Sequence, residues 1–213
     1  MTSQPVGAPR RRFADDDSPR EECGVIGIST PHGDGVAELT FFGLFALQHR
    51  GQEAAGIGVS DGSRIRLHKD EGLVSNVFNQ HTLAPLTGYH SLGHTRYSTT
   101  GANAQRNIQP YLVETMHGPM ALAHNGNLVN APELRDELLH RGVGLTATSD
   151  TEVMALMLAG VGGRTWEERL ERTLPAWKGA FSVTILTDKQ VIAARDPWGF
   201  RPMSLGRLPH GGY

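Results

Sequence analysis

The succession of short strand-like segments most constrains what this 213-residue chain can fold into. Two pairs of neighbouring segments are separated by tight turns, one containing Asp61-Gly62 and the other Asp188-Lys189. Tight turns of this kind join antiparallel strands. Strands and helices show no regular alternation, so the pattern predicts an α+β fold with largely antiparallel sheets. Strands are expected at residues 23–28, 55–59, 64–68, 92–98, 120–124, 181–187, 191–195 and 203–207.

Glycines and capping residues mark the expected helices. Gly51 lies where a C-terminal cap would end the first helix. Ser149 and Glu152, and likewise Thr165 and Glu168, have the spacing of a capping box, in which the two residues satisfy each other's backbone N–H groups. Helices are therefore expected at residues 38–49, at 72–79, from Asn130 as N-cap to Gly142, from Ser149 to Gly160, and from Thr165 onwards.

Composition excludes several classes of protein. The chain has 20 basic and 22 acidic residues, a net charge of −2, which argues against a bulk nucleic-acid binder. No apolar run approaches the ~20 residues that a transmembrane helix needs, and no apolar segment follows the N-terminal arginines, so neither a membrane span nor a secretory signal is expected. Residues 142–147 match a G-x-G-x-x-A dinucleotide pattern but follow a helix rather than a strand, which favours a helix cap at Gly142.

The cysteine and histidine content argues against a metal site. The only cysteine, Cys23, permits neither an intrachain disulfide nor a Cys-based zinc site, and this usage fits a cytoplasmic protein. His90 and His94 are four residues apart, but on a strand they would lie ~13 Å apart, too far to share a metal ion. No metal ligands are therefore expected.

Residues 1–22 and the cysteine after them suggest a specific chemistry. The segment is rich in Pro, Arg and Asp and is interpreted as a disordered leader. If it is removed, Cys23 gains a free α-amine that titrates near ~8, close to a thiol near ~8.5, so the amine can take the thiol proton. The alternative is that Cys23 is simply a small buried hydrophobic residue. Its position directly after the leader, at the start of a strand, favours a nucleophile.

Four other residues supply what acyl transfer on an amino acid would need. Asn125 and Gly126, at the end of a predicted strand, offer an amide side chain and a backbone N–H for a developing oxyanion; the alternative is an ordinary Asn-Gly turn. Arg96 offers a cation at a strand end and Asp150 an anion in the first turn of a helix, as a zwitterionic substrate would require. The alternatives are a surface charge for Arg96 and helix capping for Asp150.

Taken together and in this order, these features resemble the glutaminase domain of class II glutamine amidotransferases. The matching segments are residues 23–28, 48–57, 93–99, 124–127 and 149–152. The resemblance implies a four-layer α/β/β/α sandwich of two antiparallel sheets, the N-terminal nucleophile hydrolase fold. It also implies a propeptide at residues 1–22 and a glutaminase domain at residues 23–213.

The resemblance implies a role for each matching residue. Cys23 would be the nucleophile and, through its α-amine, the base, while Asn125 and Gly126 would form the oxyanion hole. The residues implied to bind glutamine are Arg96 at its carboxylate, Asp150 at its ammonium group, and Tyr97 and Thr99 along the pocket, with Arg50 in a supporting role.

Within the family, residues 48–52, 94–99 and 195–202 are similar to amidophosphoribosyltransferases. These enzymes use glutamine and phosphoribosyl pyrophosphate to make phosphoribosylamine for purine synthesis. The alternative is the glutaminase half of another member such as glucosamine-6-phosphate synthase, which tends to have Trp where Tyr97 stands. More distant alternatives are an amide hydrolase that passes no ammonia on, and a binding domain with a structural Cys23.

The resemblance also implies a second half that these residues do not contain. No phosphate loop of the phosphoribosyl half is found, so a C-terminally truncated domain is expected. Magnesium and an iron–sulfur cluster would belong only to the missing half, with no cofactor within these residues. The full-length protein is expected to form a homo-oligomer and to bind neither nucleic acid nor membrane.

Overall fold

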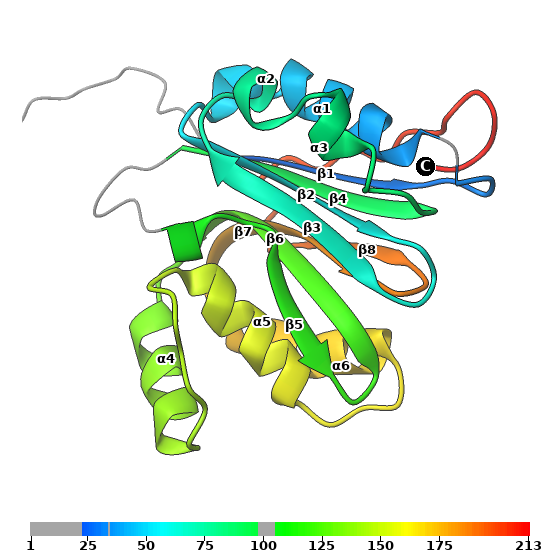
Figure 1. Ribbon diagram of the computed structural model, residues 1–213. Coiled ribbons are helices and arrows are strands. Elements are labelled where there is room, and N and C mark those ends of the chain that lie inside the picture. Colours follow the sequence, from blue (N-terminus) through cyan, green and yellow to red (C-terminus); the bar gives the residue numbers. More distant parts are fainter. Residues whose placement is uncertain (1–22, 34, 98–104) are drawn as a thin grey trace, which may run out of the picture.

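The computed structural model describes residues 23–33, 35–97 and 105–213. Two four-stranded antiparallel sheets lie face to face, and helices cover the outer surface of each (Figure 1). The layers are therefore helix, sheet, sheet and helix, which confirms the expected α/β/β/α sandwich. No described helix is long and apolar enough to cross a membrane.

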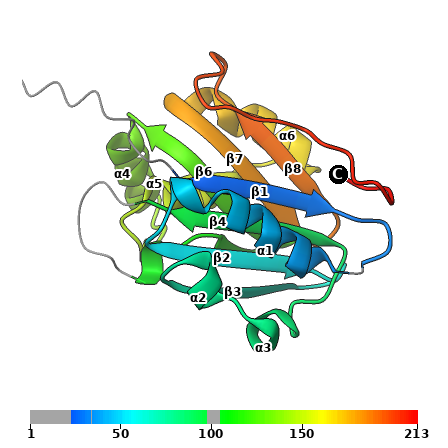
Figure 2. The ribbon, with the colours of Figure 1, turned by 90° about the horizontal axis from the view of Figure 1, so that it is seen from above.

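The first sheet contains the two strands that position Cys23 and Arg96: β1 begins directly after Cys23, and β4 ends at Arg96. Its order is β1-β4-β2-β3, so the first strand pairs with the fourth rather than the second. Helix α1 lies across its outer face, above β1 and β4 (Figure 2). The elements are β1 (Gly24–Ser29), α1 (Val36–Ala46), the 3₁₀ turn η1 (Gln48–Arg50), β2 (Ala54–Ser60), β3 (Ile65–Glu71), α2 (Val74–Val77), α3 (Gln80–Leu83) and β4 (His90–Arg96).

The second sheet has the simple order β5-β6-β7-β8, and its outer face carries the later helices. Strand β6 is the longest and is central to the site, since it pairs with β5 over its first half and with β7 over most of its length. The elements are η2 (Gln105–Asn107), β5 (Tyr111–Thr115), β6 (Gly118–Leu128), α4 (Ala131–His140), α5 (Asp150–Gly160), α6 (Trp166–Thr173), η3 (Leu174–Ala176), β7 (Gly179–Thr187) and β8 (Val191–Arg195).

Small residues allow the two sheets to pack closely. The buried cluster between them contains Ala121 and Ala123 of β6, together with larger side chains at Leu92 and Leu186. A Cβ on Gly27 of β1 would lie 2.6–2.7 Å from side chains of the facing sheet. A larger residue there would force the sheets apart, because close-packed interiors have little room to relax.

Most of the expected strands are present, with differences in two places. Residues 203–207 form no strand; instead the chain returns to β1 at its very end, where Ser29 and Tyr213 exchange backbone hydrogen bonds of 2.7 and 2.9 Å. Strand β5 was not expected from the sequence, and β6 continues beyond His124 to Leu128.

Gly51 does not end the first helix as expected, but follows the short 3₁₀ turn η1 as its C-cap residue. Helix α1 ends at Ala46 and is followed by η1, and Gly51 is extended, with φ −157°. A Cβ there would lie 2.4 Å from the Thr95 hydroxyl and 2.7 Å from the carbonyl carbon of Arg96. Glycine is needed because the chain passes directly against the end of β4, where the expected site lies.

The expected capping box at α5 is wrong. Ser149 is the N-cap residue but makes no side-chain capping bond. The fully buried Glu152 accepts hydrogen bonds from Thr146 N (2.6 Å), Ala147 N (2.8 Å) and the Tyr111 hydroxyl (2.6 Å). The segment before α5 folds back over its first turn, so Glu152 anchors that segment rather than the backbone of Ser149.

Two other caps differ in part. Thr165 accepts the Glu168 N–H as expected, but the Glu168 carboxylate bonds the N–H of Arg164, one residue earlier. Asn130 makes no side-chain cap to α4, because its amide side chain joins Ala176 and Lys178 instead. Gly142 does end α4, with φ +79°, so the glycine pattern there is a helix cap, as predicted.

Candidate active site

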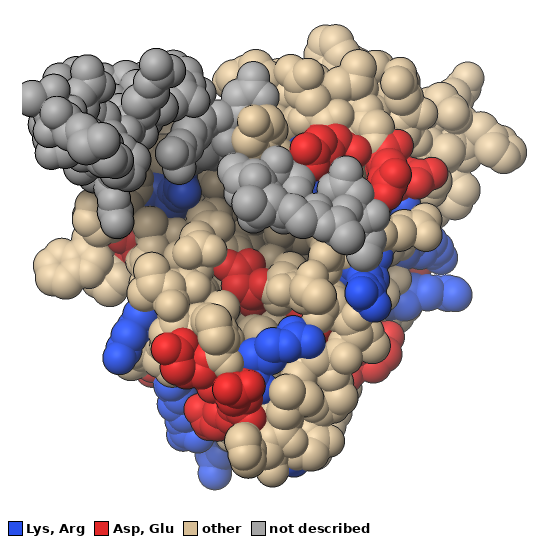
Figure 3. Space-filling model, turned by 90° about the vertical axis from the view of Figure 1, so that its left-hand side faces the viewer, with Lys and Arg blue, Asp and Glu red and all other residues tan. Residues whose placement is uncertain are grey.

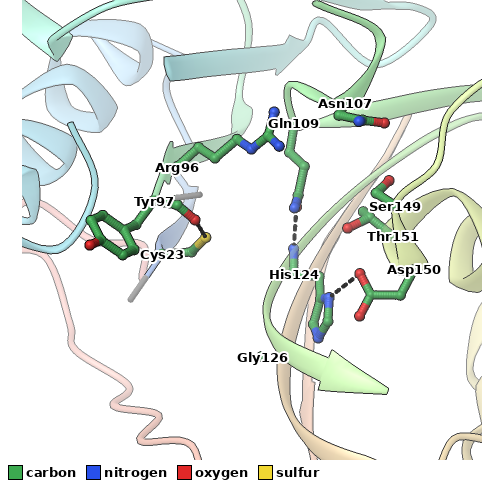
Figure 4. Close-up of a pocket in the computed structure, with 10 residues that line it drawn as sticks. All are labelled: Cys23, Arg96, Tyr97, Asn107, Gln109, His124, Gly126, Ser149, Asp150 and Thr151. Carbon is green, nitrogen blue, oxygen red and sulfur yellow. Dashed lines mark hydrogen bonds and ion pairs between the residues drawn. The ribbon is translucent and has the colours of Figure 1, made fainter. Parts of the chain in front are cut away.

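A small cavity opens where β4 ends, β6 nears its end and α5 begins (Figure 4). Its volume is about 160 Å³, below the roughly 300–1,000 Å³ of pockets for drug-sized ligands, so it suits a small molecule. Its lining contains five of the residues implied by the sequence. The lining residues are Cys23, Arg96, Tyr97, Asn107, Gln109, His124, Gly126, Ser149, Asp150 and Thr151.

Cys23 lies directly before the first residue of β1, and its side chain is partly buried. Its thiol donates a hydrogen bond to the backbone carbonyl of Tyr97, at 3.7 Å. Burial, the largest effect, raises the pKa of the Cys23 thiol, and the nearby Arg96 charge acts in the opposite direction. The thiol therefore needs a base to become a thiolate at neutral pH.

The hydrogen bonds along the free edge of β6 show which backbone N–H groups of this edge face the cavity side. Beyond the first residue of β5, Tyr111, which pairs with Leu122, the His124 N–H bonds Gln109 Oε1 at 2.6 Å. Four residues further along β6, the Leu128 N–H bonds Asp150 Oδ2 at 3.1 Å. Side chains thus replace the missing neighbour strand at both positions.

The N–H of Gly126 faces the same edge, between these two bonds. Its partner on β7 is Phe181, whose N–H and carbonyl both bond Asp196, on the far side. Gly126 and Phe181 therefore form a non-hydrogen-bonded pair, and the Gly126 N–H points away from β7. Since Gly126 lines the cavity, this N–H is a donor available to a bound group.

Only glycine fits at position 126. Its φ is +142°, a conformation that other residues rarely adopt. A Cβ there would lie 2.1 Å from the carbonyl oxygen of Ala180 and 2.8 Å from Phe181 Cα. The close approach of β7 and the backbone conformation both require that no side chain be present.

Asp150 is held as an anion at the cavity wall. Its Oδ1 lies 3.4 Å from His124 Nδ1 and its Oδ2 accepts the Leu128 N–H. Burial opposes ionisation, but the interactions with His124 and the backbone N–H groups outweigh it, so the pKa of Asp150 is lowered. A lowered pKa keeps the carboxylate charged at neutral pH.

Arg96 supplies the opposite charge at the end of β4. Arg96 lines the cavity and forms no salt bridge with a described carboxylate. Asp150 lines the same cavity from the first turn of α5. A cation and an anion across one small cavity suit a zwitterionic ligand such as an amino acid. On the surface shown in Figure 3, by contrast, described acidic and basic side chains are interspersed.

The remaining predicted residues differ in placement. Arg50 donates from Nε to the Cys23 carbonyl at 3.3 Å, which fits a supporting role. Asn125 is buried but is not among the cavity-lining residues; strand alternation places it with Ala123, toward the facing sheet. Thr99 lies outside the described residues.

Sequence reasoning missed His124 and the segment before β5. His124 stands in the tetrapeptide that contains Asn125 and Gly126, so it could have been found by asking which neighbour alternates to the same face as Gly126. Asn107 and Gln109 carried no such signal, because their place beside β6 depends on long-range folding.

The described residues contain no group of three or more His, Cys, Asp or Glu side chains placed to hold a metal ion. His94 is fully buried on β4, and burial lowers its pKa to about 3, so it is neutral at physiological pH. His90 lies on the same strand, as expected.

Comparison with known proteins identifies the family. Residues 94–212 match the family described as "Glutamine amidotransferase domain". The chain belongs to this family. The match runs from within β4 to Gly212 and includes every cavity residue except Cys23.

Individual relatives in the family are much longer. The chain is 51% identical over 198 residues to the amidophosphoribosyltransferase of Synechococcus elongatus, covering 92% of this chain and 40% of the relative. For the enzyme of Mycobacterium leprae the values are 48%, 97% and 38%. The chain thus spans about two fifths of these relatives.

A solved structure agrees with the fold. The glutamine phosphoribosylpyrophosphate amidotransferase of Bacillus subtilis, solved in complex with ADP and GMP, superposes with a TM-score of 0.81 at 39% identity. The match covers 88% of this chain and 40% of that one.

Proposed function

We propose that this chain is the glutaminase part of an amidophosphoribosyltransferase, in which Cys23 attacks the side-chain amide of glutamine. The observation that carries the proposal is the meeting of Cys23, the Gly126 N–H, Arg96 and Asp150 at one cavity. The identity of about half with named amidophosphoribosyltransferases favours this function over the glucosamine-6-phosphate synthase alternative.

The charged pair would orient the substrate. Arg96 binds the α-carboxylate and Asp150 the α-ammonium group, which places the side-chain amide toward Cys23. Tyr97 and Thr99 are proposed to line the pocket and Arg50 to steady the Cys23 backbone through its hydrogen bond. Asn125 is proposed to act with Gly126 in the oxyanion hole.

The reaction would proceed through a thioester. Once residues 1–22 are removed, the α-amine of Cys23 takes the thiol proton, and Sγ bonds to the amide carbon. The negative charge on the amide oxygen is stabilised by the Gly126 N–H. The ammonium then returns the proton to the leaving nitrogen, which departs as ammonia, and water hydrolyses the thioester to glutamate.

The proposal extends to the rest of the enzyme. Ammonia would displace pyrophosphate from phosphoribosyl pyrophosphate, giving phosphoribosylamine for purine synthesis in the cytoplasm, in a homo-oligomer. Magnesium and an iron–sulfur cluster are proposed to bind only in the rest of the enzyme. For the cluster the reason is that it needs several thiolates, and these residues contain one cysteine.

An electrophilic glutamine analogue tests the nucleophile. With residues 1–22 removed, we expect one molecule bound covalently at Cys23, located by peptide mass spectrometry, and no labelling in Cys23→Ser. The same variant should lose glutaminase activity by orders of magnitude, because a hydroxyl is a far weaker nucleophile at pH 7. Near-normal turnover in Cys23→Ser would place the nucleophile elsewhere.

A further inference from the structure

We propose that Lys69, acting through residues 107–110, positions the donor edge of β6 for the reaction. Lys69 lies on β3, outside the residues that line the cavity, and is thus a positioning residue rather than a catalytic one. The inference concerns the same site and rests on the proposed function for its kinetic consequence only.

Lys69 forms hydrogen bonds to the backbone of residues 107–110. Its Nζ donates to the carbonyl oxygens of Ile108, at 2.5 Å, and Pro110, at 3.1 Å. Burial removes water from the side chain and lowers the pKa of Lys69, and the two carbonyls supply hydrogen bonds in place of that water.

A glycine allows the segment to lie directly on the first sheet. Gly56 of β2 pairs with Lys69 of β3. A Cβ on Gly56 would come within 2.1 Å of the Gln109 carbonyl oxygen and 2.8 Å of Pro110 Cδ. The segment therefore rests on bare backbone beneath the lysine, with little freedom to shift.

The segment in turn holds two walls of the cavity, one through each of two amide side chains. Gln109 Oε1 accepts a hydrogen bond of 2.6 Å from the N–H of His124, which lies two residues before Gly126 on β6. Asn107 bonds Thr148 twice, accepting its N–H at 3.0 Å and donating to its hydroxyl at 2.9 Å, two residues before Asp150.

These contacts connect Lys69 to both groups that orient the reaction. A shift of residues 107–110 would move the β6 edge that presents the Gly126 N–H and the start of α5 that presents Asp150. Catalysis is sensitive to such shifts, since a displacement of about 1 Å can cost ~100-fold in rate. Loss of Lys69 should therefore weaken catalysis more than substrate binding.

Hydrogen exchange tests the positioning directly. In Lys69→Met, which removes both hydrogen bonds, we expect the His124 amide to exchange at least ~5-fold faster than in the wild type, as for the loss of its hydrogen bond to Gln109. Gln109→Met should have the same effect at His124. Lys69→Arg, which keeps donors, and Lys189→Met, on an exposed turn, should match the wild type. Unchanged exchange at residues 124–128 in Lys69→Met and Gln109→Met would overturn the proposal.

Kinetics with residues 1–22 removed give a second readout. We expect kcat for glutamine hydrolysis to fall ~10-fold or more in Lys69→Met, with KM within ~3-fold of the wild type, and Lys69→Arg to restore kcat. A raised KM with unchanged kcat would overturn the positioning role. If the wild type itself hydrolyses no glutamine, the proposed function fails, and the exchange measurement still decides the role of Lys69.

Discussion

Replacing Asp150 with asparagine removes one charge from the cavity while leaving its shape. The amide oxygen introduced by Asp150→Asn can still accept the Leu128 N–H, so the fold of β6 should persist. What is lost is the partner proposed for the substrate ammonium group. A hydrogen bond to a charged group contributes about 1.5–3 kcal/mol, which corresponds to a ~10- to 150-fold rise in the glutamine KM.

The assay is steady-state glutamine hydrolysis by the chain that begins at Cys23. Asp136→Asn is the matched control, because it makes the same charge change on the exposed face of α4. A KM for Asp150→Asn within ~2-fold of the control would refute the assignment. A fall in kcat alone would instead mean that Asp150 acts only in the transition state.

The same residue has a consequence for acid stability. The folded-state pKa of Asp150 is lowered below its ordinary value, so its ionised form stabilises the fold above about pH 4. That contribution is lost as the pH falls through the folded-state pKa. In Asp150→Asn, the free energy of unfolding should therefore change less with pH on the acid side than in the wild type, as measured by urea unfolding between about pH 2 and pH 5.

Two further substitutions test the geometry around the cavity. Gly126→Ala should destabilise the fold by ~2–5 kcal/mol, since it combines a strained φ with a contact to the Ala180 carbonyl, and a cost below ~1 kcal/mol in urea unfolding would contradict this. Glu152→Gln should cost ~2–4 kcal/mol, because an amide cannot accept all the hydrogen bonds that converge on the buried carboxylate, whereas the exposed Glu171→Gln should be neutral.

The sequence predicted the architecture well because hydrophobic periodicity and turn residues are local signals. The hairpins around Gly62 and Asp188 were confirmed by the β2–β3 and β7–β8 pairs. Helix ends were less predictable. Ser149 and Glu152 have the spacing of a capping box, yet the carboxylate bonds residues of the preceding segment. A cap depends on which N–H groups are left unsatisfied, and that is settled by where the loop folds.

The residues of the candidate site were likewise predictable where the signal is local and not where it depends on long-range contacts. Cys23, Arg96 and Asp150 stand at element ends, where local patterns find them, and the structure brings them to one cavity. Lys69 and Gln109 were not predicted, because they act through backbone groups on elements distant in sequence.

The free edge of β6 explains why those supporting residues are needed. Strand β5 pairs with β6 only as far as Leu122, so the edge from His124 to Leu128 has no neighbouring strand. A β5 that began earlier in the chain would bond the N–H groups on this edge and would cover the donor at Gly126. Because β5 begins only at Tyr111, that donor is exposed, but two flanking N–H groups are left that must be bonded to remain buried. Gln109 and Asp150 supply those bonds at His124 and Leu128, two residues to each side of Gly126. Hydrogen bonds therefore hold the edge on both sides of Gly126, while its N–H stays available to the substrate.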